Sequence, residues 1–195
     1  MARTGVLICI IATMAMRWVC AGGFDAPFPD ADRAKLDEFV SHGLAKADKF
    51  YTDQKYEEAA VEYEVFIQDH AKSAAIPYAM FQKARCAQLD GDPKEAIRLY
   101  DDLVDSFPTV LPYAAPALYF IAECHVQNRD MPKAVKTWME MASDADYRQH
   151  PLAAVAINQL ALNWMAQGKT EDAMKLYRRG AVDYRSGNPD QALQS

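Results

Sequence analysis

Residues 91–108 read GDPKEAIRLYDDLVDSFP and predict a helix whose first turn is marked by its sequence. Asp92 can act as the N-cap, Pro93 suits the first helical position, and Glu95 can complete a capping box. Ala96 is followed four residues later by Tyr100, so a small side chain and a large ring lie one turn apart on one helix face. The same pair recurs along the rest of the chain.

The recurring pair is an alanine followed four residues later by a ring, with spacings of 37, 38 and 39 residues between successive copies. A small side chain lets a neighbouring helix approach to about 8–10 Å, and the ring fills the space beside that contact. Another alanine stands twelve residues before the alanine of each pair. Two alanines that face each other in this way mark a tight helical hairpin. This linked pattern indicates four helix-turn-helix repeats. The pairs are Ala59 and Tyr63, Ala96 and Tyr100, Ala134 and Trp138, and Ala173 and Tyr177, and the preceding alanines are Ala47, Ala84, Ala122 and Ala161.

The pattern resembles the tetratricopeptide repeat (TPR), over about residues 36–185. The units exceed the usual period of about 34 residues. Such longer units, with phrases like FPTVLPYAAPALYFIAECH at 107–125, are similar to the cell-envelope branch of the family. That branch includes the TPR lipoprotein of the outer-membrane barrel-assembly machine and the periplasmic coordinator associated with the Tol-Pal system.

The resemblance implies an all-α, right-handed superhelix of about four helix-turn-helix repeats over residues 33–185. Turn residues separate the expected helices, as in DGDP at 90–93 and NRDMP at 128–132. Apolar residues at helical spacing complete the assignment. The expected first helices are 33–52, 76–90, 113–128 and 151–167, and the expected second helices are 54–70, 93–107, 131–144 and 170–185.

The two ends of the chain lie outside the repeats. Residues 1–21 predict a bacterial export signal, because Arg3 precedes an apolar run and small residues then allow cleavage after Ala21. The run is shorter than the roughly 20 residues of a membrane span, so we expect a soluble periplasmic or secreted protein. Lipid anchoring at Cys20 is less expected, because RWVC at 17–20 fits the lipid-attachment pattern poorly. Residues 22–32 should form a flexible lead and 186–195 a disordered tail.

The charge of the chain argues against nucleic acid and anionic lipid as partners. The net charge is −6, and removing residues 1–21 takes away two arginines and no acid, which leaves 19 basic against 27 acidic side chains, or −8. Both of those partners are bound by clustered Lys and Arg.

Cys86 and Cys124 occupy equivalent positions of consecutive repeats, where the side chains point in similar directions, so we expect two buried thiols and no disulfide.

No pattern in the sequence indicates catalysis. The histidines His42, His70, His125 and His150 form no HExxH or other paired metal spacing. Asp144, Asp146 and His150 share one loop, for which a solvated connection is favoured over a metal site that would need converging, supported ligands. Glycine-rich phosphate loops and nucleophile elbows are not found. The sequence predicts a non-enzymatic protein with no catalytic, cofactor-binding or metal-binding residues.

The resemblance places the first helices on a concave face that can accept an extended partner. Tyrosine, phenylalanine and arginine, which often dominate binding energy, occur there, although several of the rings could instead pack between repeats. The row Asp48, Arg85, Glu123 and Leu162 differs from the Lys, Asn and Arg clamp of cytosolic members, so capture of a C-terminal carboxylate is not implied. The expected partner-binding residues are Leu44, Asp48, Tyr51, Tyr78, Phe81, Arg85, Gln88, Tyr119, Glu123, Gln127, Asn158 and Leu162.

These observations predict an exported scaffold or adaptor that binds another envelope protein or a peptide segment of one. By resemblance, its role would lie in outer-membrane or cell-wall assembly. The alternative is a structural module that forms homo-oligomers through its end repeats, because the open ends of a solenoid invite pairing.

Overall fold

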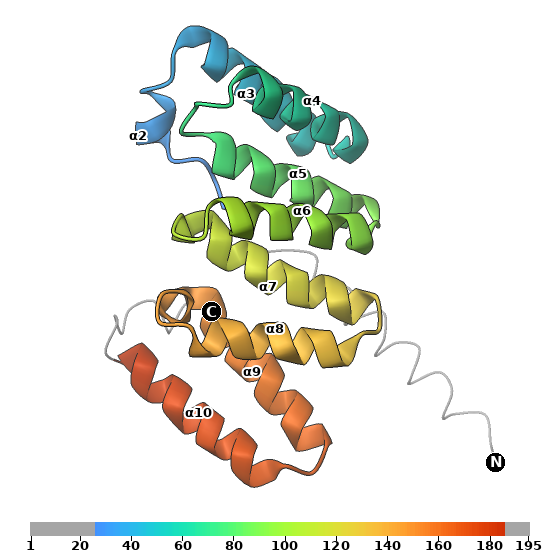
Figure 1. The fold of residues 1–195 in the computed structure, drawn as a ribbon, viewed down its shortest axis with the longest axis vertical. Coiled ribbons are helices and arrows are strands. Elements are labelled where there is room, and N and C mark those ends of the chain that lie inside the picture. Colours follow the sequence, from blue (N-terminus) through green and yellow to red (C-terminus); the bar gives the residue numbers. More distant parts are fainter. Residues whose placement is uncertain (1–25, 186–195) are drawn as a thin grey trace, which may run out of the picture.

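The computed structural model describes residues 26–185, and every regular element in that range is a helix. Four hairpins, α3–α4, α5–α6, α7–α8 and α9–α10, stack in chain order along the long axis of the molecule (Figure 1). The expected export signal at 1–21 and the expected tail at 186–195 lie outside the described residues. The helices are α2 (Asp30–Arg33), α3 (Glu38–Thr52), α4 (Tyr56–Asp69), α5 (Ile76–Asp90), α6 (Pro93–Ser106), α7 (Leu111–Gln127), α8 (Met131–Ser143), the 3₁₀ turn η1 (Tyr147–Gln149), α9 (Pro151–Ala166) and α10 (Thr170–Arg185).

The alanine pairs lie at the centre of the packing. All eight alanines of the repeat pattern are fully buried, as close approach of the two helices of a hairpin requires. The partner rings Tyr63, Tyr100 and Trp138 are buried as well, whereas Tyr177 of the last hairpin is exposed. The difference follows from position, because no described repeat covers α10. The repeat fold predicted from this pattern is confirmed.

The predicted helix ends agree with the structure to within two residues, except at the start of the first helix. A helix over 33–52 is expected from the sequence, but the chain forms the short α2, turns, and begins α3 at Glu38. Asp37 explains this start, because its carboxylate accepts a hydrogen bond from the Val40 amide at 2.9 Å and so caps the new helix.

The N-terminus of α6 has the expected N-cap but not the expected capping box. Asp92 Oδ1 accepts hydrogen bonds from the amides of Lys94 and Glu95, at 3.2 and 3.0 Å, and Pro93 is the first helical residue. Glu95 does not complete a capping box, because its carboxylate instead accepts from the guanidinium of Arg98 one turn later. The turn before this helix uses Gly91 at φ +92°, a conformation that favours glycine.

Cys86 and Cys124 are free and buried in the hairpins of the second and third repeats. Burial raises the pKa of each thiol to about 12, so both remain protonated at neutral pH. The two side chains act as small apolar residues.

No helix between residues 26 and 185 combines the length and the apolar character that crossing a membrane requires.

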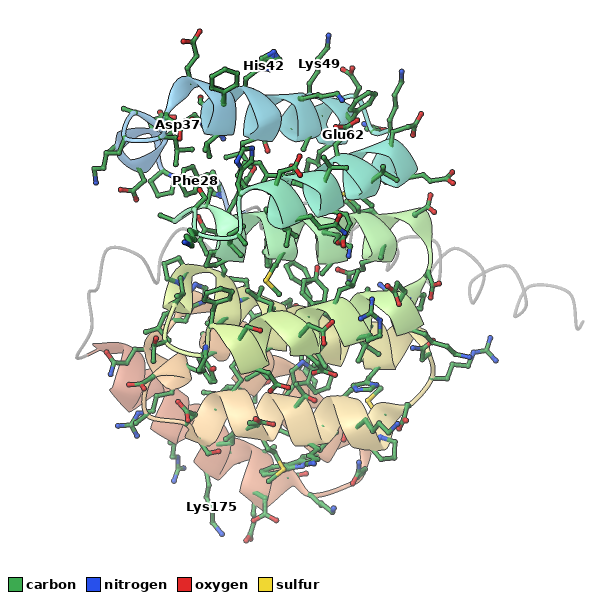
Figure 2. All side chains as sticks on the ribbon, turned by 45° about the horizontal axis from the view of Figure 1, so that its top comes forward. Phe28, Asp37, His42, Lys49, Glu62 and Lys175 are labelled. Carbon is green, nitrogen blue, oxygen red and sulfur yellow. The ribbon has the colours of Figure 1, made fainter. Side chains whose placement is uncertain are left out.

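The described part of the expected flexible lead, residues 26–32, packs against the solenoid. Ala26 and Phe28 are each only 6% exposed, and α2 follows them at the N-terminal edge of the stack (blue in Figure 1). Figure 2 shows Phe28 directed inward, whereas His42 and Lys49 of α3 point away from the fold. Burial of the Phe28 ring is a physical reason for this stretch to hold one position.

Candidate partner-binding surface

The twelve residues expected on the concave face differ widely in exposure. Some lie inside the packing between repeats, and others remain accessible on the first helices of their hairpins. Leu44, Tyr78, Phe81, Arg85, Gln88 and Glu123 are buried, Asp48, Tyr51 and Tyr119 are half-buried, and Gln127, Asn158 and Leu162 are exposed.

Leu44, Phe81, Arg85 and Gln88 are buried inside the packing of the repeats, which corrects the expectation that they face a partner. Tyr78 is also buried, and its ring contacts that of Phe28 in the N-terminal segment of the chain. Phe81 of α5 is fully buried, with its ring centroid 5.8 Å from that of Tyr100, 6.2 Å from that of Tyr113 and 6.1 Å from that of Phe120. Leu44 of α3 is likewise fully buried. Neither side chain can meet a partner without opening the fold.

Arg85 and Gln88 form a polar group inside the same packing. The Arg85 guanidinium carbon lies 4.4 Å from the centroid of the Phe120 ring, and Arg85 Nη1 donates to Gln88 Oε1 at 2.8 Å. The hydroxyl of Tyr100 donates to the same oxygen at 3.1 Å. A cation over a ring, satisfied by a neighbouring amide, is a stable way to bury an arginine. Arg85 therefore links α5, α6 and α7 instead of binding a ligand.

Asp48 of α3 is the half-buried member with the richest set of contacts. Its Oδ1 accepts hydrogen bonds from the hydroxyls of Tyr63 and Tyr78, each at 2.8 Å, and its Oδ2 accepts from Arg33 Nη2 at 2.7 Å. Burial, together with the negative charge of Asp48, raises the pKa of both tyrosines, so both hydroxyls remain neutral donors. The result is a fixed carboxylate on the layer of first helices, aimed at a cation.

At the other end of the solenoid, the last hairpin exposes several apolar side chains. Leu162 and Met165 of α9 are 49% and 47% exposed, and Met174 of α10 is 49% exposed. Nearby, the Tyr177 hydroxyl donates to Asn158 Oδ1 at 2.9 Å. This end presents apolar surface without a described repeat to cover it.

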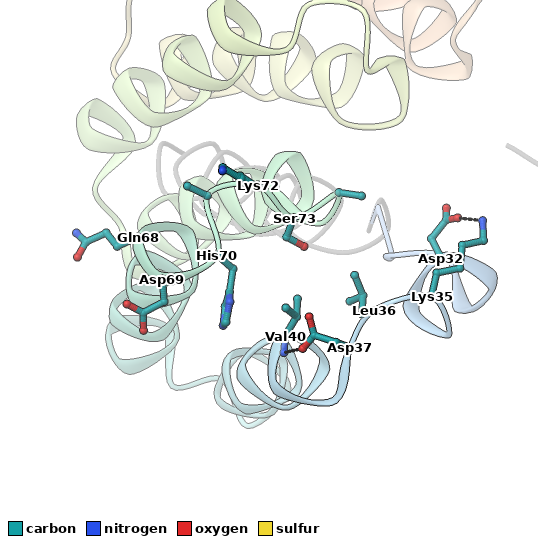
Figure 3. A pocket seen from close by; sticks show the side chains of 12 residues that line it. Asp32, Lys35, Leu36, Asp37, Val40, Gln68, Asp69, His70, Lys72 and Ser73 are labelled. Atoms are coloured by element: carbon teal, nitrogen blue, oxygen red, sulfur yellow. Dashed lines mark hydrogen bonds and ion pairs between the residues drawn. The ribbon is translucent and has the colours of Figure 1, made fainter.

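An open cavity of about 580 Å³ lies beside the N-terminal hairpin, between the start of α3 and the α4–α5 connection (Figure 3). His70, just after α4, and Asp37, just before α3, both line it. Three charged groups of its wall have local partners, because Asp37 caps α3 and Lys35 Nζ pairs with Asp32 Oδ1 at 2.7 Å. These three groups serve structural contacts at the start of the first hairpin.

The loop that gathers Asp144, Asp146 and His150 is used for helix capping. Asp144 Oδ1 accepts from the amides of Asp146 and Tyr147, at 2.8 and 3.1 Å, and His150 Nδ1 accepts from the Leu152 amide at 3.2 Å, at the start of α9. Nowhere in residues 26–185 do three histidine, cysteine or acidic side chains gather closely enough to hold a metal ion.

Four stacked hairpins with buried alanine pairs define a TPR solenoid, a class whose repeats mediate interactions between proteins. The chain belongs to the family of SusR N-terminal TPR domains, which matches residues 40–183. A comparison with curated proteins finds no significant match.

Solved structures with a similar fold include the nearly identical TPR-like repeats of a putative kinesin light chain from Podosopora anserina. One of these structures has 18% sequence identity and a TM-score of 0.55, over 82% of this chain and 83% of that one. A second structure, of a substituted form of the same repeats, has 17% identity and a TM-score of 0.55, over 74% of each chain. At this level of identity the likeness concerns the fold alone.

Sequence reasoning missed two contributors to the surface around Asp48. The sequence places Phe28 in the lead and Arg33 at the start of the first helix, and it gives no reason to expect either near the first helices of the later repeats. A signal was present in APFP at 26–29, because an aromatic residue between two prolines is poorly suited to a solvated, flexible stretch.

Proposed function

We propose that this TPR chain is an exported, non-enzymatic scaffold that binds an extended segment of another cell-envelope protein along the first helices of its hairpins. The observation that carries the proposal is the position of residues 26–29. They precede α2 without forming a helix, and they contact α5 through Phe28 and α7 through Pro27, so this face can accept a peptide segment.

The location in the envelope is supported by the sequence. Residues 1–21 have the pattern of an export signal, and the repeats resemble the long units of the envelope branch of the TPR family. A role in outer-membrane or cell-wall assembly follows from that resemblance. Expression in a bacterium with two membranes, followed by fractionation and measurement of the intact mass, tests the location. We expect cleavage after Ala21, and a diacylglyceryl increment on an N-terminal Cys20 would instead show a lipoprotein.

The binding role is tested by capture of proteins from envelope extract with matched variants. Tyr119→Ala removes a half-buried ring from α7, and Val65→Ser changes an exposed apolar side chain on the second helix α4. If the first helices bind the partner, Tyr119→Ala weakens the capture of one defined protein and Val65→Ser does not. Equal capture by both variants would contradict the assignment to this face.

A second candidate is a structural module that self-associates through its end repeats. The exposed Leu162, Met165 and Met174 of the last hairpin favour it. Measurement of the mass in solution separates the two functions. A dimer that dissociates in Met174→Ser, on the second helix α10, while Tyr119→Ala leaves envelope capture unchanged, would support the module over the scaffold.

A further inference from the structure

Residues 26–33 contact the layer of first helices as a bound peptide would. The Phe28 ring lies with its centroid 5.5 Å from that of Tyr78 on α5. The carbonyl oxygen of Pro27 lies 3.5 Å from the hydroxyl of Tyr113 on α7, a long hydrogen bond in which the tyrosine donates. The segment thus spans two successive repeats with one buried ring and one backbone contact.

The same segment supplies the cation for Asp48. Arg33 Nη2 lies 2.7 Å from Asp48 Oδ2, and the Arg33 guanidinium carbon lies 5.7 Å from the centroid of the Phe28 ring. Tyr63 and Tyr78 hold the other carboxylate oxygen, so the acceptor is already oriented when Arg33 arrives. The ion pair is only partly solvated and lies next to a ring, so the orientation of the guanidinium is fixed as well as its charge being paired.

The segment stands outside the repeat pattern that builds the solenoid. It has no alanine and ring pair, and only residues 34–37 join it to α3. A short tether gives an attached ligand an effective concentration in the millimolar range. Contacts that are weak by themselves therefore suffice to keep the site filled from within the chain.

We propose that Asp48, Tyr78 and Tyr113 form a peptide-binding site in which Tyr63 orients the Asp48 carboxylate, and that residues 26–33 fill it as a competing internal ligand. The partner is a protein segment with an aromatic residue beside a proline, followed by a helical turn that carries an arginine about five residues further on. This proposal rests on the proposed function and specifies its partner chemistry.

Charge and shape both support that occupant. The site offers the Asp48 carboxylate and the rings of Tyr78 and Tyr113 on a chain with a net charge of −6, so a segment with a basic and an aromatic residue complements it. The ring of Tyr113 lies with its centroid 5.9 Å from that of Tyr78, so the aromatic surface is continuous across the repeats. Such a partner segment binds by displacing residues 26–33, so the internal segment lowers the apparent affinity of the site for the partner.

The test uses a fluorescent synthetic peptide with the sequence of residues 26–35, APFPDADRAK. We expect the full chain carrying both Phe28→Ala and Arg33→Gln to bind this peptide at least about tenfold more tightly than the unaltered chain, because its own segment no longer competes. Adding Asp48→Asn to that variant should abolish the gain. If the altered chain keeps its helical circular dichroism and still does not bind the peptide, residues 26–33 are a structural strap and the proposal is wrong.

A second measurement covers the case in which the altered chain fails to fold. Hydrogen exchange of the unaltered chain is followed with and without a large excess of the peptide. Displacement predicts faster exchange at the amides of residues 30–37 with the peptide. It also predicts no change with a control peptide in which Phe28→Ala and Arg33→Gln are combined. Unchanged exchange under saturating peptide would overturn the proposal.

The outcome is independent of the capture experiment. If the peptide does not bind but a defined envelope protein is still captured through Tyr119, the scaffold function stands and the site around Asp48 does not. If the peptide binds and no envelope protein is captured, the site stands and the envelope role is lost.

Discussion

The ring centroid of Phe81 on α5 lies 6.1 Å from that of Phe120 on α7, so an aromatic contact joins the second and third repeats directly. Tyr100 of α6 stacks on the same Phe120 ring, with centroids 5.9 Å apart and planes inclined by 19°. Arg85 lies over that ring as well. This aromatic cluster connects three helices and is a main stabilising contact in the middle of the solenoid.

Phe81→Ala should destabilise the fold by about 3–5 kcal/mol, because it removes a fully buried ring and leaves a cavity in that cluster. The free energy of unfolding from urea titration measures the effect. Phe39→Ala is the matched control, since Phe39 is 83% exposed and its loss should change stability by less than about 0.5 kcal/mol. Equal stability of the two variants would contradict the burial of Phe81.

Ala122→Leu should cost about 1–3 kcal/mol, because the extra atoms would overpack the contact between α7 and α8. Ala45→Leu makes the same change on an exposed face of α3 and should leave the melting temperature nearly unchanged. A melting temperature that stays the same in Ala122→Leu would mean that Ala122 does not face Ala134 across the hairpin.

Acid should weaken the contact between α4 and α5. Hydrogen bonds from Lys83 and Gln68 hold the pKa of Glu64 below its ordinary value of 4.5. Since the pKa of Glu64 is lower in the folded state, the ion pair of Lys83 and Glu64 adds to the free energy of unfolding above pH 4.5. This contribution is lost as the pH falls through the folded-state pKa. Because the pair is partly solvated, the loss should amount to a few tenths of a kcal/mol.

The fall in unfolding free energy between neutral pH and about pH 3 measures this contribution. Glu64→Gln should make that fall smaller, and Lys83→Met should do the same from the other side of the pair. An identical pH dependence in the unaltered chain and both variants would show that the pair does not contribute.

Cys86 and Cys124 should resist alkylation in the native protein, because burial raises the pKa of both thiols to about 12 and hides them from reagent. In denaturant without reductant, both should be labelled, as peptide mass analysis would show. Protection that persists until reductant is added would reveal a disulfide and would require the two helices to approach more closely than they do here.

The repeat architecture was predictable because its signal is local. The alanine and ring at a four-residue spacing reflect the contact inside one hairpin, and they recur wherever a hairpin forms. Exposure on the first helices was less predictable, because it depends on the neighbouring repeat. From the sequence alone we expect Arg85 on the surface, yet it is buried because Phe120 from the next repeat covers it.

The position at which residues 26–33 dock could not be predicted from sequence patterns, although APFP at 26–29 gives a hint that Phe28 is buried. The contacts of this segment join residues far apart in the chain, such as Pro27 and Tyr113, which no periodicity relates. Prolines and acids in this stretch also favour a loop on composition alone. Only the three-dimensional stacking of α3, α5 and α7 brings the partners together.

The contact between Tyr113 and Pro27, which are 86 positions apart, has a consequence for the order of folding. Hairpins of a solenoid form from local contacts and can assemble early, whereas residues 26–33 acquire their full set of contacts only once α3, α5 and α7 are in place. The segment should therefore dock last, and pulse-labelled hydrogen exchange should show amides of α5 protected before those of α2. During synthesis, Asp48 and Tyr78 would then be open to another chain until residues 26–33 cover them.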